Sequence, residues 1–288
     1  MSNADISTDP QDQGTLFIVA TPIGNLDDIS QRAIKTLSDV DLIAAEDTRH
    51  TAKLLSHLGL SKRTFALHDH NEKQKAQQVL TWLQQGQNVA LVSDAGTPLI
   101  SDPGYALVSL CREQGAQVTP IPGPCAAIAA LSCSGLPTDQ FQFIGFAPAK
   151  SKARQSFFSD AYNSGMTSII YESTHRIMAS LEDLSVALGE QAQVVLAKEL
   201  TKSFETFFSG TVTELQQFLQ QDPARQKGEI VLMLPGKSNK ASAVSEEALR
   251  LIALLEEHMP LKQACGVAAD YLGQKKNALY KAVIAQKQ

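Results

Sequence analysis

Short apolar runs alternate with amphipathic segments through the first 121 residues of the chain. The runs have the length and composition of buried strands, and the segments between them repeat apolar positions at helical spacing. One helix is expected to begin after Asp27 or Asp28 as its N-cap. The predicted strands span residues 16–20, 42–45, 64–67, 89–92 and 117–121, and the predicted helices span residues 29–37, 48–59, 72–85 and 105–114. This βαβα order predicts a mostly parallel sheet with helices on both faces.

Residues 93–104, SDAGTPLISDPG, follow the fourth predicted strand and form the loop around which the first half is organised. We expect Asp102 to cap the next helix and Pro103 to open it. The loop lies at the carboxyl end of a strand, where open α/β sheets bind ligands. Gly96 lets a ligand approach the backbone, while Thr97 and Asp94 offer polar atoms to it. On the pattern alone, an ordinary helix-capping turn explains the loop equally well.

The segment IPGP at residues 121–124 breaks the periodicity and predicts a domain boundary. A helix of small residues, CAAIAALSC at residues 125–133, follows it. Its alanines would let a ligand or another helix lie close to it, and an ordinary tightly packed helix explains the pattern at least as well. Two strands around Lys202 are close enough in sequence to form a hairpin, which predicts a mixed second sheet. The other elements expected there are strands over residues 141–146, 168–171, 194–200, 205–209 and 230–234, and helices over residues 152–163, 175–188 and 213–221.

The last part of the chain has three short helical patterns with no strand between them, over residues 246–257, 261–271 and 276–285. This spacing predicts a small helical bundle, of which the helix-turn-helix is one form. A Ser-, Lys- and Asn-rich stretch at residues 236–242 is interpreted as a linker. The expected organisation is a loose leader at residues 1–13, α/β domains at residues 14–122 and 123–236, and a helical tail at residues 244–288.

Composition places the chain among ordinary globular proteins, with 43% hydrophobic and 19% charged residues in a length of 288. No apolar run approaches the roughly 20 residues of a membrane span, and the polar N-terminus does not resemble a signal peptide, so we expect a cytoplasmic protein without membrane contact. The net charge of −5 argues against indiscriminate coating of nucleic acid. The four cysteines are widely spaced, which favours reduced thiols over disulfides or zinc.

Two common phosphate-binding motifs are missing from the first strand–loop junctions. The loop TPIGNLDD at residues 21–28 contains Gly24 but no G-x-G-x-x-G, and the chain has no G-x-x-x-x-G-K-[ST]. An acid, a glycine and a threonine without a phosphate cradle suit a nucleoside-like ligand, of which S-adenosylmethionine (SAM) is the commonest cosubstrate. The segment His68–Asp69–His70 has no partner cluster, and no metal is expected.

Several ordered blocks carry a resemblance to a known family. They are ATPIGNLDDIS, AAEDTRHTAKLL, VSDAGTPLISDPG, PIPGPCAAIAALSCSGLPTD, FIGFAP, YESTHRI, KELTK and GEIVLML. In this order they resemble the ribosomal RNA small-subunit methyltransferase I family of the tetrapyrrole-methylase superfamily, from about residue 17 to residue 234. The resemblance implies two α/β domains with SAM in the cleft between them, a homodimer, and 2′-O-methylation of a cytidine ribose in the decoding region of small-subunit ribosomal RNA.

The resemblance also implies the residues that bind SAM. They are Ile23, Gly24, Asp94, Ala95, Gly96, Thr97, Cys125, Ala126, Ala127, Glu172, Ala197 and Glu229. The basic cluster that the family often has after its GF-x-P block is diluted here. The candidate RNA-binding residues are Arg49, Lys150, Lys152, Arg154, Lys275 and Lys276.

Methyl transfer to a ribose hydroxyl needs alignment above all, together with a group that accepts the hydroxyl proton. Glu46, Lys198 and Glu199 are the candidate acceptors because they stand at strand ends beside the inferred cleft. The alternative for Glu46 is a solvated first helical turn, and for the other two it is cross-strand ion pairing.

Two other functions stay open at this point. A corrin or porphyrin methylase belongs to the same superfamily, but such enzymes usually carry a G-x-G-x-G-D loop where this chain has TPIGNLDD. A non-catalytic RNA-binding or ribosome-assembly protein is the alternative from another class. Asp94, Gly96 and Thr97 argue against a decayed SAM site, and a measurement of SAM binding separates the two classes.

Overall fold

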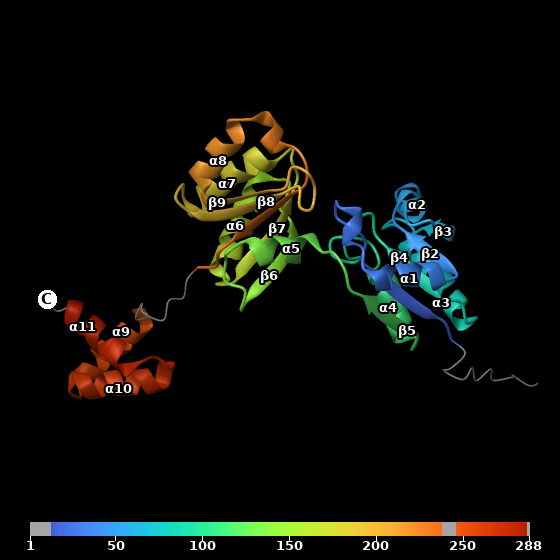
Figure 1. Ribbon diagram of the computed structural model, residues 1–288. Coiled ribbons are helices and arrows are strands. Elements are labelled where there is room, and N and C mark those ends of the chain that lie inside the picture. Colours follow the sequence, from blue (N-terminus) through green and yellow to red (C-terminus); the bar gives the residue numbers. More distant parts are fainter. Residues whose placement is uncertain (1–12, 238–245, 287–288) are drawn as a thin grey trace, which may run out of the picture. The chain divides into compact units, whose positions relative to one another are not determined.

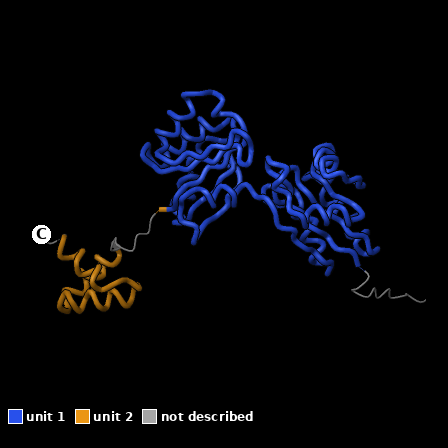
Figure 2. The backbone as a smooth tube through the Cα atoms, in the orientation of Figure 1, with its two compact units in different colours: residues 1–236 blue, residues 237–288 orange. Residues whose placement is uncertain are grey.

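The computed structural model describes residues 13–237 and 246–286 (Figure 1). The chain divides into two compact units, residues 1–236 and 237–288 (Figure 2). Most of the predicted leader and most of the predicted linker lie outside the described residues. The predicted division of the first unit into domains at residue 122 stays a prediction, although its residues build two separate sheets.

The first sheet is entirely parallel, with the strand order β3-β2-β4-β1-β5. Its strands are β1 (Thr15–Val19), β2 (Leu42–Ala45), β3 (Arg63–Ala66), β4 (Val89–Val92) and β5 (Gln117–Ile121). Its helices are α1 (Gln31–Asp39), α2 (Thr48–His57), α3 (Glu72–Gln84) and α4 (Tyr105–Glu113). The predicted parallel sheet is confirmed.

Strand β2 explains why the strands of this sheet are continuous apolar runs. Leu42 and Ala44 pack into the cluster that α3 and α4 contribute to, whereas Ile43 and Ala45 pack into the cluster on the side of α1 and α2. All four side chains are therefore buried. Helices cover both faces of the sheet, as the sequence predicts.

The second sheet is mixed, with the order β6-β7-β10-β8-β9. Only the β6–β7 pair is parallel among its four pairings, and β8 and β9 form the predicted hairpin. Its strands are β6 (Phe141–Phe146), β7 (Thr167–Glu172), β8 (Gln193–Lys198), β9 (Thr206–Thr211) and β10 (Ile230–Leu234). Its helices are α5 (Ala126–Cys133), α6 (Ser151–Asn163), α7 (Ile177–Leu188) and α8 (Val212–Gln220).

Strand β10 separates the two cores of this second half. Leu232 packs into the cluster formed with α6, α7 and α8, and its neighbour Val231 packs into the cluster on the opposite face, with α5. Ile23, from the loop after β1, belongs to this second cluster. A side chain that follows the first sheet thus packs against the second sheet.

Two predicted helix caps are wrong. Asn25 caps a short 3-10 helix (Leu26–Asp28), and Ser30 rather than Asp27 or Asp28 caps α1 by accepting the Ala33 N–H at 3.1 Å. Helix α4 begins after Gly104 rather than after Asp102. In both places the chain turns once more before the helix starts, which local propensity does not reveal.

The second unit consists of α9 (Glu246–Glu256), α10 (Leu261–Leu272) and α11 (Lys276–Gln286). Small side chains of α10, among them Ala264 and Ala268, form its core with Ile252 and Leu279. Gly273 ends α10 in the left-handed conformation, and α11 begins three residues later. The three predicted helices are confirmed.

Candidate functional site

The candidate site begins where the strand connections of the first sheet change direction. The chain leaves β1 towards β2 and leaves β4 towards β5, so two adjacent strands send their connections in opposite directions across the sheet. Such a point opens a crevice at the carboxyl ends of the strands. Thr21 and Gly96 join the two loops there, because each donates its N–H to the carbonyl of the other, at 2.9 and 3.0 Å.

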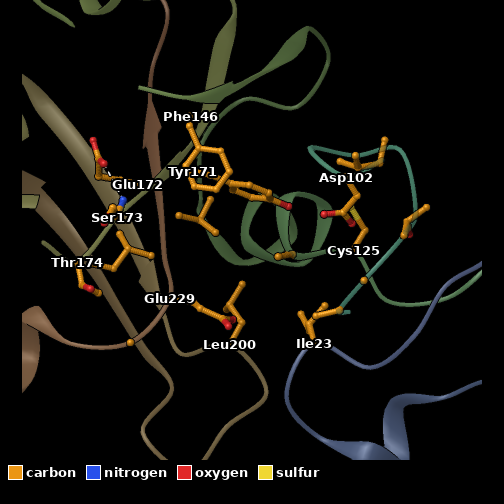
Figure 3. A pocket seen from close by; sticks show the side chains of 18 residues that line it. Ile23, Asp102, Cys125, Phe146, Tyr171, Glu172, Ser173, Thr174, Leu200 and Glu229 are labelled. Carbon is orange, nitrogen blue, oxygen red and sulfur yellow. Dashed lines mark hydrogen bonds between the residues drawn. The ribbon is translucent and has the colours of Figure 1, made fainter. Parts of the chain in front are cut away.

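A cavity of about 440 Å³ lies beside this crevice (Figure 3). That volume is in the range of small-molecule sites. Its wall is built by loops of the first sheet and by strands and loops of the second. The lining residues are Ile23, Ala95, Gly96, Thr97, Ile100, Asp102, Cys125, Ala126, Phe146, Tyr171, Glu172, Ser173, Thr174, Leu200, Gly228, Glu229, Ile230 and Val231.

Gly96 has a φ of +86°, a conformation that disfavours any side chain. A Cβ there would also lie 3.3 Å from Cγ2 of Ile23. Thr97 does not direct its hydroxyl to a ligand, as the sequence suggested, but donates it to the Pro124 carbonyl at 2.9 Å. The loop after β4 is therefore fastened to the segment that leads into α5, with its backbone open to the cavity.

Strained backbone gathers in two loops of the site. Among the described residues, four that are not glycine have a positive φ: Leu99, Ser101, Glu199 and Thr201. The first two flank Ile100, and the second two flank Leu200, both of which line the cavity. Such conformations cost about 1–3 kcal/mol each and cluster at functional sites. Their position on two separate loops of one cavity supports a ligand-binding role.

The loop after β1 and the loop after β8 are in direct contact. Asn25 donates its N–H to Oγ1 of Thr201 at 3.0 Å. A Cβ on Gly24 would lie 2.6–2.9 Å from Lys202, Thr201 and the Leu200 carbonyl. Gly24 is thus needed for the close approach of these loops and does not itself line the cavity.

Asp102 is the carboxyl group of the cavity wall that sequence analysis assigned to a helix cap. Burial, together with the nearby carboxylates of Glu46 and Asp94, raises the pKa of Asp102 to about 6. A hydrogen bond from Ser93 acts in the opposite direction and lowers it. The group can therefore change between its acid and its base form close to neutral pH. Its only sequence signal is a second aspartate eight residues after Asp94.

Two aromatic residues of the wall were also missed. Tyr171 accepts the Ala127 N–H at 3.2 Å, and burial raises the pKa of its hydroxyl to about 12, so it keeps its proton. Phe146 packs edge-to-face on Tyr171 at a centroid distance of 5.6 Å. Figure 3 draws the two rings together, apart from Ile23. Both belong to sequence blocks that were recognised, but their roles were not.

Eight of the twelve predicted ligand-binding residues line the cavity, and four do not: Gly24, Asp94, Ala127 and Ala197. Asp94 lies one loop away, where its carboxylate accepts the Asp47 N–H at 3.1 Å. Its own N–H points to Glu46, at 3.4 Å from Oε2. Asp94 therefore ties the loops after β2 and β4 together rather than facing the cavity.

Glu172 lines the cavity, but its carboxylate is fully buried and engaged. It accepts hydrogen bonds from the Ser180 hydroxyl and the Ser173 N–H, and it pairs with Arg176 at 3.0 Å. This network holds the segment that carries Ser173 and Thr174 against the cavity. The carboxylate of Glu172 therefore has a positioning role, and the predicted contact of SAM with this segment stays a prediction.

None of the three predicted proton acceptors lines the cavity. Burial raises the pKa of Glu46, although a hydrogen bond from the backbone of Asp94 acts to lower it. Burial alone would raise the pKa of Glu199. The carboxylate accepts the Glu229 N–H and pairs with Lys202 at 3.0 Å, and these contacts outweigh burial, so its pKa is lowered. Lys198 is 7% exposed, on β8. Asp102, in contrast to these three residues, lines the cavity.

The predicted RNA contacts divide into exposed and buried residues. Lys150 and Lys152 are exposed at the start of α6, and Lys275 and Lys276 are exposed at the start of α11. Arg49 is also exposed and pairs with Asp47 at 2.7 Å. The remaining prediction is wrong: Arg154 is 4% exposed, and its Nε donates to Asp183 at 2.7 Å, so RNA cannot reach it.

The described residues contain no group of three or more His, Cys, Asp or Glu side chains that could hold a metal ion. None of the helices in residues 13–237 and 246–286 is long and apolar enough to cross a membrane. Cys111 and Cys265 are buried, whereas Cys133 is exposed.

Comparison with known proteins places this geometry in a family. Residues 15–216 match the Tetrapyrrole (Corrin/Porphyrin) Methylases, and residues 242–287 match the RsmI C-terminal HTH domain. A solved structure of diphthine synthase has the same fold, with a TM-score of 0.61 at 14% identity over 77% of this chain and 90% of that one.

Two relatives extend over nearly the whole chain. Ribosomal RNA small subunit methyltransferase I of Escherichia coli O157:H7 is 56% identical over 95% of this chain and 96% of its own length. The protein of the same name from Haemophilus influenzae is 54% identical over 93% and 95%. The expected fold class is confirmed: two α/β sheets of the tetrapyrrole-methylase type, with a helical C-terminal module. The chain belongs to the ribosomal RNA small subunit methyltransferase I family.

Proposed function

We propose that the protein transfers a methyl group from SAM to the 2′-hydroxyl of a cytidine ribose in the decoding region of small-subunit ribosomal RNA. The observation that carries the proposal is the near full-length similarity to small-subunit methyltransferases, including the helical module. The choice of ribose, cytidine and region comes from the family resemblance. A corrin or porphyrin methylase is disfavoured, since the relatives that match over the whole chain bear the ribosomal RNA name.

The cavity suits SAM in size and in chemistry. Ile23, Leu200 and Val231 offer apolar contacts, and the left-handed Gly96 leaves its backbone accessible. Asp102 lines the cavity, where its carboxylate favours a cationic ligand, whereas the carboxylate of Glu229 pairs with Lys202 at 3.1 Å. SAM would supply a methyl group activated by its positively charged sulfur.

We propose Asp102 as the proton acceptor. The ribose oxygen would form its bond to the methyl carbon as the carbon–sulfur bond breaks, and the hydroxyl proton would pass to the Asp102 carboxylate. The products are S-adenosylhomocysteine and the 2′-O-methylated nucleotide. Holding the three reacting atoms in line supplies most of the acceleration, and a positioned base adds about 10²- to 10⁴-fold. The protonated hydroxyl of Tyr171 can donate a hydrogen bond at the same wall.

The test combines binding and product analysis. Calorimetry of the purified full chain with SAM should give one site per chain. Small subunits from a strain without the enzyme should gain one methyl group, which nucleoside mass spectrometry should place on the ribose of a cytidine. A methyl group on the base would refute the ribose assignment, and a protein that neither binds SAM nor methylates any subunit would favour the non-catalytic assembly protein.

Two further expectations belong to the same proposal. The family resemblance supports a homodimer, which sedimentation equilibrium of the full chain measures directly. A ribosomal substrate supports action in the cytoplasm, which fractionation of cells that carry the tagged protein tests.

A further inference from the structure

Strand β6 contains an irregularity that turns one aromatic ring towards the cavity. Its pairing with β7 shifts register between Phe143 and Phe146, and Gly145 between them has a φ of +70°. In an uninterrupted strand, positions 143 and 146 would face opposite sides of the sheet. Instead, both rings pack against Tyr171, at centroid distances of 4.8 and 5.6 Å.

The neighbouring residues confirm that the bulge changes which face each side chain occupies. Ile144 and Ala147 both pack into the core on the side of α6 and α7, although they are an odd number of residues apart. Phe143 packs into the cluster on the other face. Without the extra residue, Phe146 would join the covered core of Ile144. A β-bulge that redirects a side chain beside a site is a recurrent device.

The consequence is a large apolar ring that is 55% exposed and lines the cavity. We propose that Phe146 is the surface on which the nucleobase of the target nucleotide stacks while its ribose enters the cavity. This inference rests on the proposed function. If the ribose enters the cavity, its base has to leave the stack of neighbouring bases in the RNA, and an aromatic side chain compensates for the lost stacking.

The position of Phe146 separates this role from contact with SAM. Figure 3 draws it away from Ile23, which lies close to Gly96 in the loop after β4. The Phe146 ring is in T-shaped contact with Tyr171, so the ring is oriented before a base arrives. Stacking tolerates any base, so Phe146 would position the nucleotide without selecting its identity.

Phe146→Ala should lower kcat/KM for small subunits from a strain without the enzyme by about tenfold to a hundredfold. Most of the loss should appear in KM for the subunit, because stacking contributes to binding before the methyl group moves. Phe146→Tyr keeps the ring and should restore activity, whereas Phe146→Leu keeps apolar volume without the ring and should not. SAM affinity by calorimetry should be unchanged in all three variants.

Phe141→Ala is the matched control, because Phe141 is on the same strand, is 42% exposed and does not line the cavity. It should leave KM for the subunit unchanged. Three results would overturn the inference while wild-type methylation is intact: normal KM in Phe146→Ala, full activity in Phe146→Leu, or weakened SAM binding, which would assign the ring to the cosubstrate. Wild-type protein that methylates no subunit would instead overturn the proposed function.

Discussion

Replacing Asp102 with Asn tests the site most directly, because it should stabilise the protein and impair its chemistry at once. Asn has nearly the same shape and can still accept a hydrogen bond from Ser93, but it cannot ionise or take up a proton. The carboxyl group has its pKa raised from 3.8 to about 6, first by burial and then by the neighbouring acids. Its charged form is therefore unfavourable in the folded protein.

The size of the stabilisation follows from this shift. A rise of roughly 2 pKa units, at 1.36 kcal/mol each, would cost the folded protein about 3 kcal/mol at pH 8. The carboxyl is only half-buried, so solvent screening reduces the cost to about 1 kcal/mol. Because the folded protein binds the proton more tightly than the unfolded chain, wild-type stability rises as the pH falls from above 6 towards 4. The advantage of Asp102→Asn should therefore vanish near pH 4.

Two assays check the two halves of the prediction. Thermal melts should place Asp102→Asn about 2–4 °C above the wild type at pH 8 and level with it near pH 4. Single-turnover methylation of small subunits with saturating SAM should be slowed by about 10²- to 10⁴-fold, and the wild-type rise in rate through pH 6 should disappear. A normal single-turnover rate would remove Asp102 from proton transfer, and a lower melting temperature at pH 8 would refute the desolvation argument.

Three other perturbations have defined outcomes. Gly96→Leu should abolish SAM binding in calorimetry. The substitution strains the left-handed backbone by about 1–2 kcal/mol and brings Cβ to 3.3 Å from Ile23. Unchanged affinity for SAM would exclude this loop from the site. Asp183→Asn should cost about 3–5 kcal/mol in denaturant unfolding at pH 7, because it leaves Arg154 buried without its charged partner; a cost under about 1 kcal/mol would contradict this. Against burial, hydrogen bonds from Ser151, Gln155 and Arg154 lower the pKa of Asp183, so the stabilisation by its carboxylate should be lost in acid. Removal of the residues after Asn239 should leave SAM affinity intact but weaken binding to the subunit and make that binding less dependent on salt. The reason is that the five lysines and one aspartate after His258 give that segment a charge of +4, which suits contact with phosphates. An unchanged salt response would exclude contact between this segment and the RNA.

The order and type of the elements could be predicted from the sequence because they depend on local patterns. Strand β2 is apolar at every position since both of its faces are covered, and this run is visible in the sequence. The mixed sheet followed from two strands separated by a short turn, and the helical module from apolar spacing alone. The ordered blocks of the first unit also located the loops that build the cavity.

The roles of individual polar residues were decided by tertiary structure. Arg154 had the sequence context of an RNA contact, but Asp183, 29 residues away, turns it into half of a buried ion pair. The Thr97 hydroxyl is used by the Pro124 carbonyl, 27 residues away. Neither partner can be recognised from the residues around Arg154 or Thr97.

Asp102 and Phe146 illustrate the same limit from the opposite direction. An aspartate before Pro-Gly is typical of a helix cap, yet the helix begins two residues later, and Asp102 is left on the cavity wall. Alternation assigns Phe146 to the covered face of β6, and only the bulge at Gly145 reverses that assignment. Periodicity and capping are encoded locally in the sequence. Desolvation, hydrogen-bond partners and the exposure of a ring depend on which distant segments the fold brings together.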